Sequence, residues 1–399
     1  MNLFKKIYCR TFQAIFRLAM PFLPYRQPEI LDHVTDVPAL LQKSNIRTVL
    51  LITGPNLRRS GATQTLEEGL QTAHIPYIVY DKTSSNPTVD NVEAAWELYM
   101  KNHCEALIAF GGGSPMDCAK AVGARVTYPQ KTVDQMKGLL KVWKKIPPLF
   151  AIPTTAGTGS EVTITSVITN SALKHKYTMN SFPLIPAYAV LDPTVTLTLP
   201  PSLTATTGMD ALTHAVEAYI GGSTTHETRG YALEAVKLIF ENLEIAYNNG
   251  SDKTARKNML HAAYIAGIAF SKSYVGYVHA IAHTLGGQYN LPHGLANAVL
   301  MPIVLEAYGA SAHQKLHELA VVAGIASPDN SHETAAKAFI QEIRAMNERM
   351  NIPAGFSNIV EADIPMLAEH ADKEANPLYP VPKLMDVKEL EKIYHLVIL

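Results

Sequence analysis

The feature that most restricts the fold of this sequence is an alternation of short apolar runs with helical segments between residues 47 and 192. Five runs have the length and the Val, Ile and Leu content of buried strands, and most are bounded by Gly, Pro, Asn or Asp. They span 47–54, 76–81, 105–113, 149–155 and 188–192. The segments 60–74 and 88–103 between them repeat apolar residues at helical spacing. Such an alternation is typical of a parallel sheet covered on both faces, so we expect an α/β domain.

The character of the chain changes at Pro200 and Pro201. Beyond this pair the strand-like runs stop, and the sequence up to Leu399 shows almost only helical patterns. A chain of 399 residues also exceeds what one hydrophobic core usually serves. We therefore predict an extension over 1–27, an α/β domain over 28–200 and an all-helical domain over 201–399.

The extension reads as a basic amphipathic helix. Apolar residues recur near helical period with Lys5, Lys6, Arg10 and Arg17 between them, and no acidic residue precedes Glu29. A secretory signal is a poor match, because arginines interrupt the apolar stretch and no small-residue cleavage pattern follows. The remaining interpretations are a helix packed on the body or on a second subunit, a contact with a membrane surface, and an organellar address.

Composition removes several classes of function. With 34 Lys and Arg against 35 Asp and Glu, the chain has no net field to attract a phosphate backbone, so we expect no nucleic-acid partner. The three cysteines show no C-x-x-C spacing, which argues against disulfides and thiolate metal sites and favours the cytoplasm. No run of eighteen uncharged apolar residues is present, so no membrane-spanning helix is predicted.

Two glycine-rich loops are placed at strand ends. Gly111, Gly112, Gly113 and Ser114 follow one predicted strand and precede a helix that opens with Pro115. Backbone N–H groups and the positive end of a helix then face one point, where an anion such as a phosphate is stabilised. A bare tight turn is the alternative, because the loop matches neither G-x-G-x-x-G nor a Walker loop. The second loop supplies hydroxyl donors at Thr154, Thr155, Thr158 and Ser160.

The helical domain carries a candidate metal site. Asp210 and His214 are four residues apart, and His279 and His283 repeat that spacing, which places each pair on one face of a helix. His293 follows ten residues after His283. One carboxylate and several imidazoles suit a divalent ion such as iron or zinc. A single histidine on an apolar helix is usually only a core residue, but this gathering favours a metal site.

Four motifs together resemble the iron-containing, or group III, alcohol dehydrogenase family. They are GGGSPMDCAKA (111–121), PTTAGTGSEVT (153–163), TGMDALTHAVEAY (207–219) and HAIAHTLGGQYNLPHGLANAVLMP (279–302). The resemblance runs from about residue 28 to the C-terminus. It implies an α/β dinucleotide-binding domain followed by an all-α metal-binding domain, the architecture also found in dehydroquinate synthase.

The resemblance implies roles for individual residues. Asp210, His214, His279 and His293 match the family's four metal ligands, with Fe²⁺ expected and Zn²⁺ or another divalent ion as alternatives. His283 matches a histidine near the nicotinamide that does not bind the metal, so we predict that it relays a proton. The predicted contacts of NAD or NADP are Gly54, Asn56, Gly111, Gly112, Gly113, Ser114, Asp117, Thr154, Thr155, Thr158, Ser160, Lys176 and His283.

One position departs from the family pattern. Members that prefer NAD tend to carry an Asp at the end of the first strand, which bonds the ribose hydroxyls and repels a 2′-phosphate, whereas this chain has Gly54. Asn56, Arg58 and Arg59 are close by in sequence. We predict that NADP(H) is accepted, unless the two arginines only solvate a helix face.

The implied activity is hydride transfer between NAD(P) and a small primary or secondary alcohol or its carbonyl compound. Phe270, Tyr274 and Tyr277 flank the metal histidines and are either substrate-facing or part of the helix core. A polyol dehydrogenase of the same fold and a metal- or dinucleotide-binding protein without turnover are the alternatives. A homo-oligomer is expected from the resemblance.

Overall fold

The computed structural model describes residues 1–171 and 175–399, which form two compact units. One unit is Pro24–Leu199, and the other joins Met1–Leu23 to Pro200–Leu399. The N-terminal extension is therefore not a separate part of the molecule. It packs with the C-terminal helices, although 176 residues of the other unit stand between them in the sequence.

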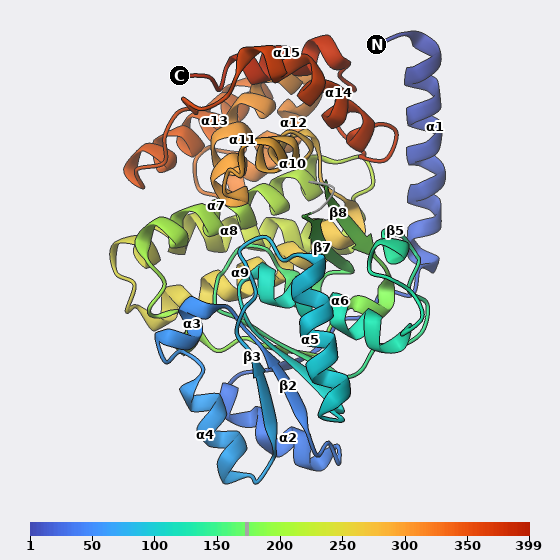
Figure 1. The fold of residues 1–399 in the computed structure, drawn as a ribbon. Coiled ribbons are helices and arrows are strands. Elements are labelled where there is room, and N and C mark those ends of the chain that lie inside the picture. The colour runs from blue at the N-terminus through green and yellow to red at the C-terminus, as the bar shows by residue number, and fades with distance from the viewer. Residues whose placement is uncertain (172–174) are drawn as a thin grey trace. The chain divides into compact units, whose positions relative to one another are not determined.

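A six-stranded sheet forms the centre of the unit Pro24–Leu199 (Figure 1). The strand order is β1-β9-β6-β4-β2-β3, and all neighbouring strands in it are parallel. The strands are β1 Glu29–Leu31, β2 Val49–Ile52, β3 Tyr77–Tyr80, β4 Ala106–Gly111, β6 Leu149–Pro153 and β9 Tyr188–Val190. Each of the five apolar runs contains one of these strands, so the predicted parallel sheet is confirmed. Only β1, which is three residues long and largely exposed, had not been predicted.

Helices cover both faces of this sheet. They are α2 Val37–Lys43, α3 Pro55–Arg59, α4 Gln64–Thr72, α5 Val89–Lys101 and α6 Gly113–Thr127. Successive residues of β2 point to opposite faces: Leu50 and Ile52 join the core under α5 and α6, whereas Val49 and Leu51 join the core under α2 and α4. Burial on both faces is the physical reason for the uninterrupted apolar runs in the sequence.

A second, three-stranded sheet was not predicted. It has the order β5-β8-β7, with β7 and β8 antiparallel. Its strands are β5 Gly138–Leu139, β7 Thr165–Asn170 and β8 His175–Asn180. The polar stretches TSVITN and HKYTMN lack the continuous apolar character of the central strands, so apolar content did not reveal them.

The unit that contains the C-terminal half is helical, as predicted. Its helices are α7 Pro201–Ile220, α8 His226–Asn248, α9 Lys253–Ser273, α10 Tyr277–Tyr289, α11 His293–Tyr308, α12 Ala310–Val322, α13 His332–Arg349, α14 Ile364–Ala375 and α15 Val387–His395. Helix α7 is buried from Gly208 to Ile220 and packs against α8, α9 and α11. Within 1–171 and 175–399, no helix combines the length and apolar character needed to cross a bilayer.

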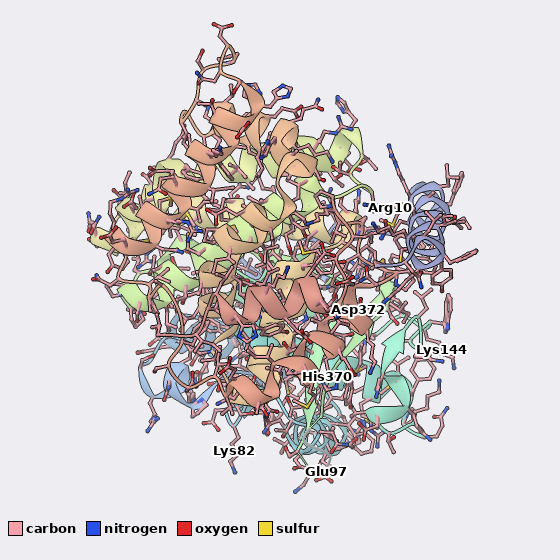
Figure 2. All side chains as sticks on the ribbon, turned by 90° about the horizontal axis from the view of Figure 1, so that it is seen from above. Arg10, Lys82, Glu97, Lys144, His370 and Asp372 are labelled. Atoms are coloured by element: carbon pink, nitrogen blue, oxygen red, sulfur yellow. The ribbon has the colours of Figure 1, made fainter. Side chains whose placement is uncertain are left out.

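The extension forms helix α1, Leu3–Ala19, on the outside of this helical unit (Figure 1). The labelled Arg10 and Asp372 lie on its inner side in Figure 2. The expectation that the helix packs on the body is met by contacts with the segment 372–386. These contacts are polar, and Phe16 adds an aromatic edge contact with Tyr274.

Candidate functional site

Three helices position the predicted metal ligands. Asp210 and His214 lie one turn apart on α7, as their spacing predicts, and both are buried. His279 lies in the first turn of α10, which begins directly after Gly276, and it is buried as well. His293 is the first residue of α11 and follows Pro292, a residue suited to a helix start.

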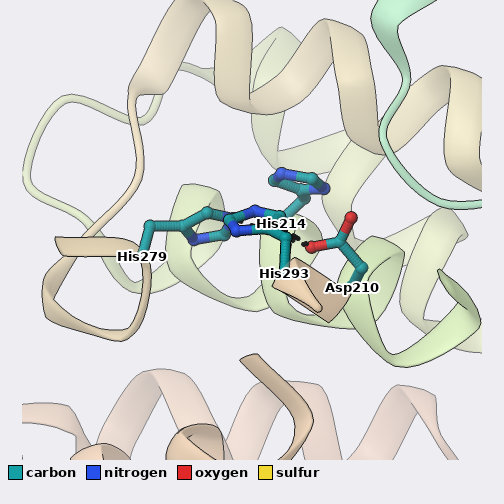
Figure 3. Close-up of side chains that lie close together, drawn as sticks. All are labelled: Asp210, His214, His279 and His293. Carbon is teal, nitrogen blue, oxygen red and sulfur yellow. Dashed lines mark ion pairs between the residues drawn. The ribbon is translucent and has the colours of Figure 1, made fainter. Parts of the chain in front are cut away.

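The four side chains converge at one point (Figure 3). One ligand atom from each of Asp210, His214, His279 and His293 lies within 4.8 Å of the others. Asp210 Oδ1 is 3.6 Å from His293 Nε2 and 4.0 Å from His279 Nε2. The rings of His214 and His279 stack with centroids 4.5 Å apart. The structure thus brings together all four predicted ligands, although 83 positions separate the first from the last in the sequence.

A glycine allows α11 to approach α7 closely enough for this convergence. A Cβ atom at Gly294 would lie 2.4 Å from the backbone oxygen of Thr206, a distance that no side chain tolerates. The same Cβ would stand 3.4 Å from Asp210 Cβ. Gly294 therefore places His293, its neighbour in the chain, beside the carboxylate on α7.

The contacts of Asn297 show that acceptor atoms of three ligands point toward the same place. Its Nδ2 donates to Asp210 Oδ1 at 2.7 Å and lies 3.2 Å from His279 Nε2 and 3.1 Å from His293 Nε2. Three electron-pair donors thus converge on the buried amide nitrogen of Asn297, and within residues 1–171 and 175–399 its buried Oδ1 has no hydrogen-bond partner. Such convergence of one carboxylate and several imidazoles fits a divalent cation.

Glu217 orients the His279 ring by accepting a hydrogen bond from the ring nitrogen that faces away from the cluster. This buried carboxylate on α7 accepts a hydrogen bond from His279 Nδ1 at 2.7 Å and from the backbone N–H groups of Gly276 and Val278 at 2.7 and 2.8 Å. Burial raises the pKa of Glu217 to about 7, although hydrogen bonds from the backbone N–H groups of Gly276 and Val278 oppose this rise. Burial also lowers the pKa of His279 well below its ordinary value. A proton fixed on Nδ1 leaves Nε2 as the atom that faces the cluster.

Sequence analysis missed Glu217, although a signal was present. It follows Asp210 by seven residues and His214 by three on the same predicted helix, and these spacings share one face. A buried acid at such a position is unusual unless it has a partner.

His283 lies beside the cluster and has its own carboxylate partner. Its Nδ1 is 2.6 Å from Glu374 Oε1, and Tyr379 donates its hydroxyl to the same oxygen at 2.8 Å. Its ring stacks on that of His293, with centroids 5.2 Å apart. The sequence held no signal for Glu374, because α14 and α10 come together only in the fold.

The aromatic residues next to the metal histidines play different parts. Phe270 stacks on the His214 ring at 4.1 Å, so it borders the cluster. Tyr274 is partly buried and makes an edge contact with Phe16. Tyr277 is fully buried, and its hydroxyl bonds Asn376 and the backbone of Met385. Of the two interpretations left open for Tyr277, the structure supports helix core.

In the α/β unit the two glycine-rich loops pack against each other. The first turns from β4 into α6, which begins at Gly113, and the backbone N–H of Thr154 in the second loop donates to the carbonyl oxygen of Gly111 at 3.1 Å. A Cβ at Gly112 would lie 3.2 Å from Thr155 Oγ1, and one at Gly113 would lie 3.0 Å from Thr158 Cγ2. These glycines therefore permit the close approach of the second loop.

A buried lysine holds the second loop to α6. Lys120 Nζ donates to Ser160 Oγ, Thr163 Oγ1 and the carbonyl oxygens of Thr163 and Thr165 at 2.8–3.0 Å. Ser160 in turn donates to Asp117 Oδ1 at 3.0 Å. Burial lowers the pKa of Lys120 to about 8 and raises that of Asp117 to about 6. Lys120 was not among the predicted residues, although it lies in the first quoted motif.

The remaining predicted nucleotide contacts are distributed as follows. Ser114 donates its hydroxyl to the Ser85 carbonyl oxygen, and Lys176 donates to Asn86 Oδ1 at 3.0 Å. Gly54 follows β2 and precedes α3. A Cβ atom added at Gly54 would lie 3.6 Å from the carbonyl oxygen of Thr83. His283 belongs to the helical unit, whereas all the other predicted contacts belong to the α/β unit.

The two arginines after Gly54 are already engaged. Arg58 pairs with Glu67, and Arg59 donates to Asn56 Oδ1 at 2.6 Å. A 2′-phosphate would have to compete with these partners. The prediction that NADP(H) is accepted therefore rests chiefly on the missing negative charge at position 54.

A parallel α/β unit with paired glycine loops and a helical unit with a carboxylate–imidazole cluster are the parts of a metal-dependent oxidoreductase. Two family models match the chain: iron-containing alcohol dehydrogenase over residues 31–193, and the C-terminal part of the Fe-containing alcohol dehydrogenase family over 204–398. The chain thus belongs to the iron-containing alcohol dehydrogenase family, and the resemblance drawn from four motifs is confirmed.

Individual relatives agree with this family. A 1,3-propanediol dehydrogenase of Citrobacter freundii is 38% identical over 352 residues, which cover 87% of this chain and 90% of that protein. An NAD-dependent methanol dehydrogenase of Bacillus methanolicus is 34% identical over 365 residues, which cover 90% of this chain and 95% of that protein. A solved structure of a 1,3-propanediol oxidoreductase superposes with a TM-score of 0.89 at 35% identity and covers 93% of this chain and 98% of its own.

Proposed function

We propose that this enzyme transfers a hydride between NAD(P) and a small alcohol or its carbonyl compound, with a divalent metal held by Asp210, His214, His279 and His293. The observation that carries the proposal is the convergence of these four donors within 4.8 Å. Membership of the iron-containing family makes Fe²⁺ the first candidate, and Zn²⁺ suits the same donor set. A cation bound there supplies Lewis-acid chemistry that polarises an alcohol or carbonyl oxygen.

The protein's own groups prepare this site. Glu217 holds the proton of His279 on Nδ1, so that Nε2 stays unprotonated and directed at the cluster. Phe270 covers one face of His214 and excludes water from that ring. Because Asp210, His214 and His279 are buried, little reorganisation is needed when charge develops on the substrate oxygen.

His283 is the proposed proton relay. Because its Nδ1 contacts Glu374, Nε2 is the ring atom that can exchange a proton with the substrate or with water. The ring is about one-third exposed, so it can also return the proton to solvent. Tyr379 bonds the same oxygen of Glu374 and limits the rotation of that carboxylate.

The dinucleotide is proposed to bind at the two glycine loops of the α/β unit. The backbone N–H groups at the start of α6 and the hydroxyl of Thr158, whose oxygen accepts from Ser160 N, offer donors to a pyrophosphate. NAD appears in the name of the Bacillus methanolicus relative, and the absence of an acid at Gly54 supports acceptance of NADP as well. Hydride transfer itself is the chemistry of the cofactor.

The substrate class follows from the relatives. Their names include a short diol and a one-carbon alcohol, so small alcohols and their aldehydes are proposed for this chain. A 1,3-diol is a second candidate, since the Citrobacter freundii protein is named for one. A homo-oligomer and a cytoplasmic location are proposed on the family resemblance and on the three buried, unbridged thiols.

The test combines metal analysis with a substrate screen. The purified protein is loaded with Fe²⁺ or Zn²⁺, dialysed and analysed, and then assayed with methanol, ethanol, butanol, 1,3-propanediol and their aldehydes against NAD(H) and NADP(H). Asp210→Asn removes a charged ligand and is expected to lose both metal and turnover. Asp329→Asn in an exposed loop is the matched control. Full metal content and turnover in Asp210→Asn would contradict the proposed site.

A further inference from the structure

Helix α1 turns its apolar face away from the protein. The large apolar side chains that it exposes are Leu3, Phe4, Ile7, Tyr8, Phe12, Ile15 and Leu18, and Phe22 follows just beyond the helix. Phe4 is 84% and Leu18 is 74% exposed. The buried residues of the helix are Cys9 and Gln13. A surface helix normally directs its apolar stripe at the core, so this arrangement is inverted.

Polar contacts hold the other face of α1 against the helical unit. Lys5 pairs with Asp372 at 2.6 Å, and the N-terminal ammonium group pairs with Asp386. Arg10 donates to the backbone oxygens of Val381 and Pro382, and Gln13 donates to those of Pro377 and Tyr379. The inner side of the helix thus has its partners within the protein (Figure 2).

The unit itself does not account for the outer face. A contiguous apolar surface of this kind on a folded protein marks a site that contacts a partner or a membrane. At about 100° per residue, the exposed apolar side chains occupy one half of the helix, and Lys6, Arg10 and Arg17 follow one another along its edge. Lys6 and Arg17 are exposed.

The charge of this segment distinguishes between possible occupants. Residues 1–28 contain five basic and no acidic residues. A second copy of α1 would bring the same basic residues and no acid to pair with them, so two packed copies gain no ion pair. A membrane with anionic lipids meets both needs of this helix. Its acyl-chain region takes up the apolar side chains, and its negative headgroups attract Lys6 and Arg17.

We propose that α1 lies flat in the surface of a membrane that contains anionic lipids, with its apolar side chains below the headgroups and Lys6 and Arg17 at the phosphates. Seventeen residues give a helix of about 25 Å, which is short for a crossing and suits an in-plane position. The polar anchors on the inner face then attach the whole enzyme to that surface. The alcohol and aldehyde chemistry would thus take place next to the bilayer.

The experiment measures partition of the full-length, metal-loaded protein onto vesicles by co-sedimentation. Vesicles of phosphatidylcholine alone are compared with vesicles that also contain phosphatidylglycerol, at low and at high salt. Binding is expected to the anionic vesicles and to weaken with salt. The double variant Lys6→Gln, Arg17→Gln is expected to bind them about 25-fold more weakly, because each cation near such a surface contributes about fivefold.

Matched variants separate the two contributions. Ile7→Gln with Ile15→Gln is expected to abolish binding, whereas Leu203→Gln with Ile245→Gln changes two exposed apolar residues of α7 and α8 and is expected to bind normally. Lys253→Gln with Lys257→Gln on exposed positions of α9 is the control for charge. All these side chains are exposed, so activity in solution and melting temperature are expected to stay unchanged. These two readings keep the result independent of the proposed catalytic function.

Two results would overturn the proposal. One is equal partition of the wild type and of both α1 variants. The other is no vesicle binding at all, together with an oligomer that dissociates when Ile7 and Ile15 are replaced, which would assign the apolar face to a second copy of the chain.

Discussion

Replacement of Glu217 by Gln tests whether this residue, rather than the ligands alone, sets the geometry of the metal site. The carboxylate is buried and accepts three hydrogen bonds. Oε1 accepts from Val278 N, and Oε2 accepts from both Gly276 N and His279 Nδ1. Glutamine has the same shape but can place an oxygen on only one of these two sides.

The expected loss of unfolding free energy follows from the less costly of the two orientations of the new amide group. If the oxygen of the new amide keeps Gly276 and His279, its NH₂ group faces the N–H of Val278. Two donors then oppose each other in a buried place, which costs about 1–3 kcal/mol of unfolding free energy. Loss of the negative charge also weakens the hold on the Nδ1 proton of His279. Replacing the hydrogen-bond partner of a metal-binding histidine typically lowers metal affinity about 10–100-fold.

Two measurements check this prediction. The Kd for Zn²⁺ or Fe²⁺ is obtained by competition with a chelator, and the melting temperature is recorded for the metal-free protein. Glu306→Gln is the control, because Glu306 is an exposed residue of α11 whose pairing with Arg344 contributes about 0–1 kcal/mol. A Glu217→Gln protein with the metal affinity and the melting temperature of the wild type would refute the reasoning.

Three further predictions concern the relay, the cofactor and the pH response. His283→Ala is expected to keep its metal while kcat/KM falls about 10²–10⁴-fold; unchanged kinetics in this variant would exclude the relay. Gly54→Asp fits sterically, and its charge is expected to lower kcat/KM for NADP(H) about tenfold relative to NAD(H); an unchanged ratio would place the 2′-phosphate elsewhere. Burial raises the pKa of Glu161 from 4.5 to about 7, so the native state keeps a proton that the unfolded state releases, and unfolding free energy falls as pH rises through that interval. Glu161→Gln should remove this loss, which amounts to about 2 kcal/mol between pH 5 and 7 in urea titrations; parallel pH curves for the two proteins would contradict the assignment.

The parallel sheet was predictable from local patterns. Strands such as β2 and β4 are covered on both faces, and this environment requires an unbroken apolar run that a reader of the sequence can recognise. Helices α7 and α10 follow from their spacing, and that spacing places Asp210 with His214 and His279 with His283.

Other features had no such local signal. Strands β7 and β8 are polar enough to look like loops, because their stability comes from pairing with each other rather than from a continuous core. Glu374 reaches His283 across 91 positions, and Asn297 meets three ligands from two other helices and its own. The residue spacing within one segment does not predict contacts between residues of different helices.

The sequence by itself determined the central strands, the helices that carry the cluster and the chemical groups of the site, because these depend on residue types and short-range spacing. The tertiary structure alone decided that Glu217 supports His279, that Lys120 holds the second glycine loop, and that α1 presents its apolar side to the outside. The amphipathic pattern of α1 predicts a helix with two unlike faces, but the pattern is the same whichever face docks. Which face docks is set by the acids and carbonyl oxygens of the segment 372–386, far along the chain.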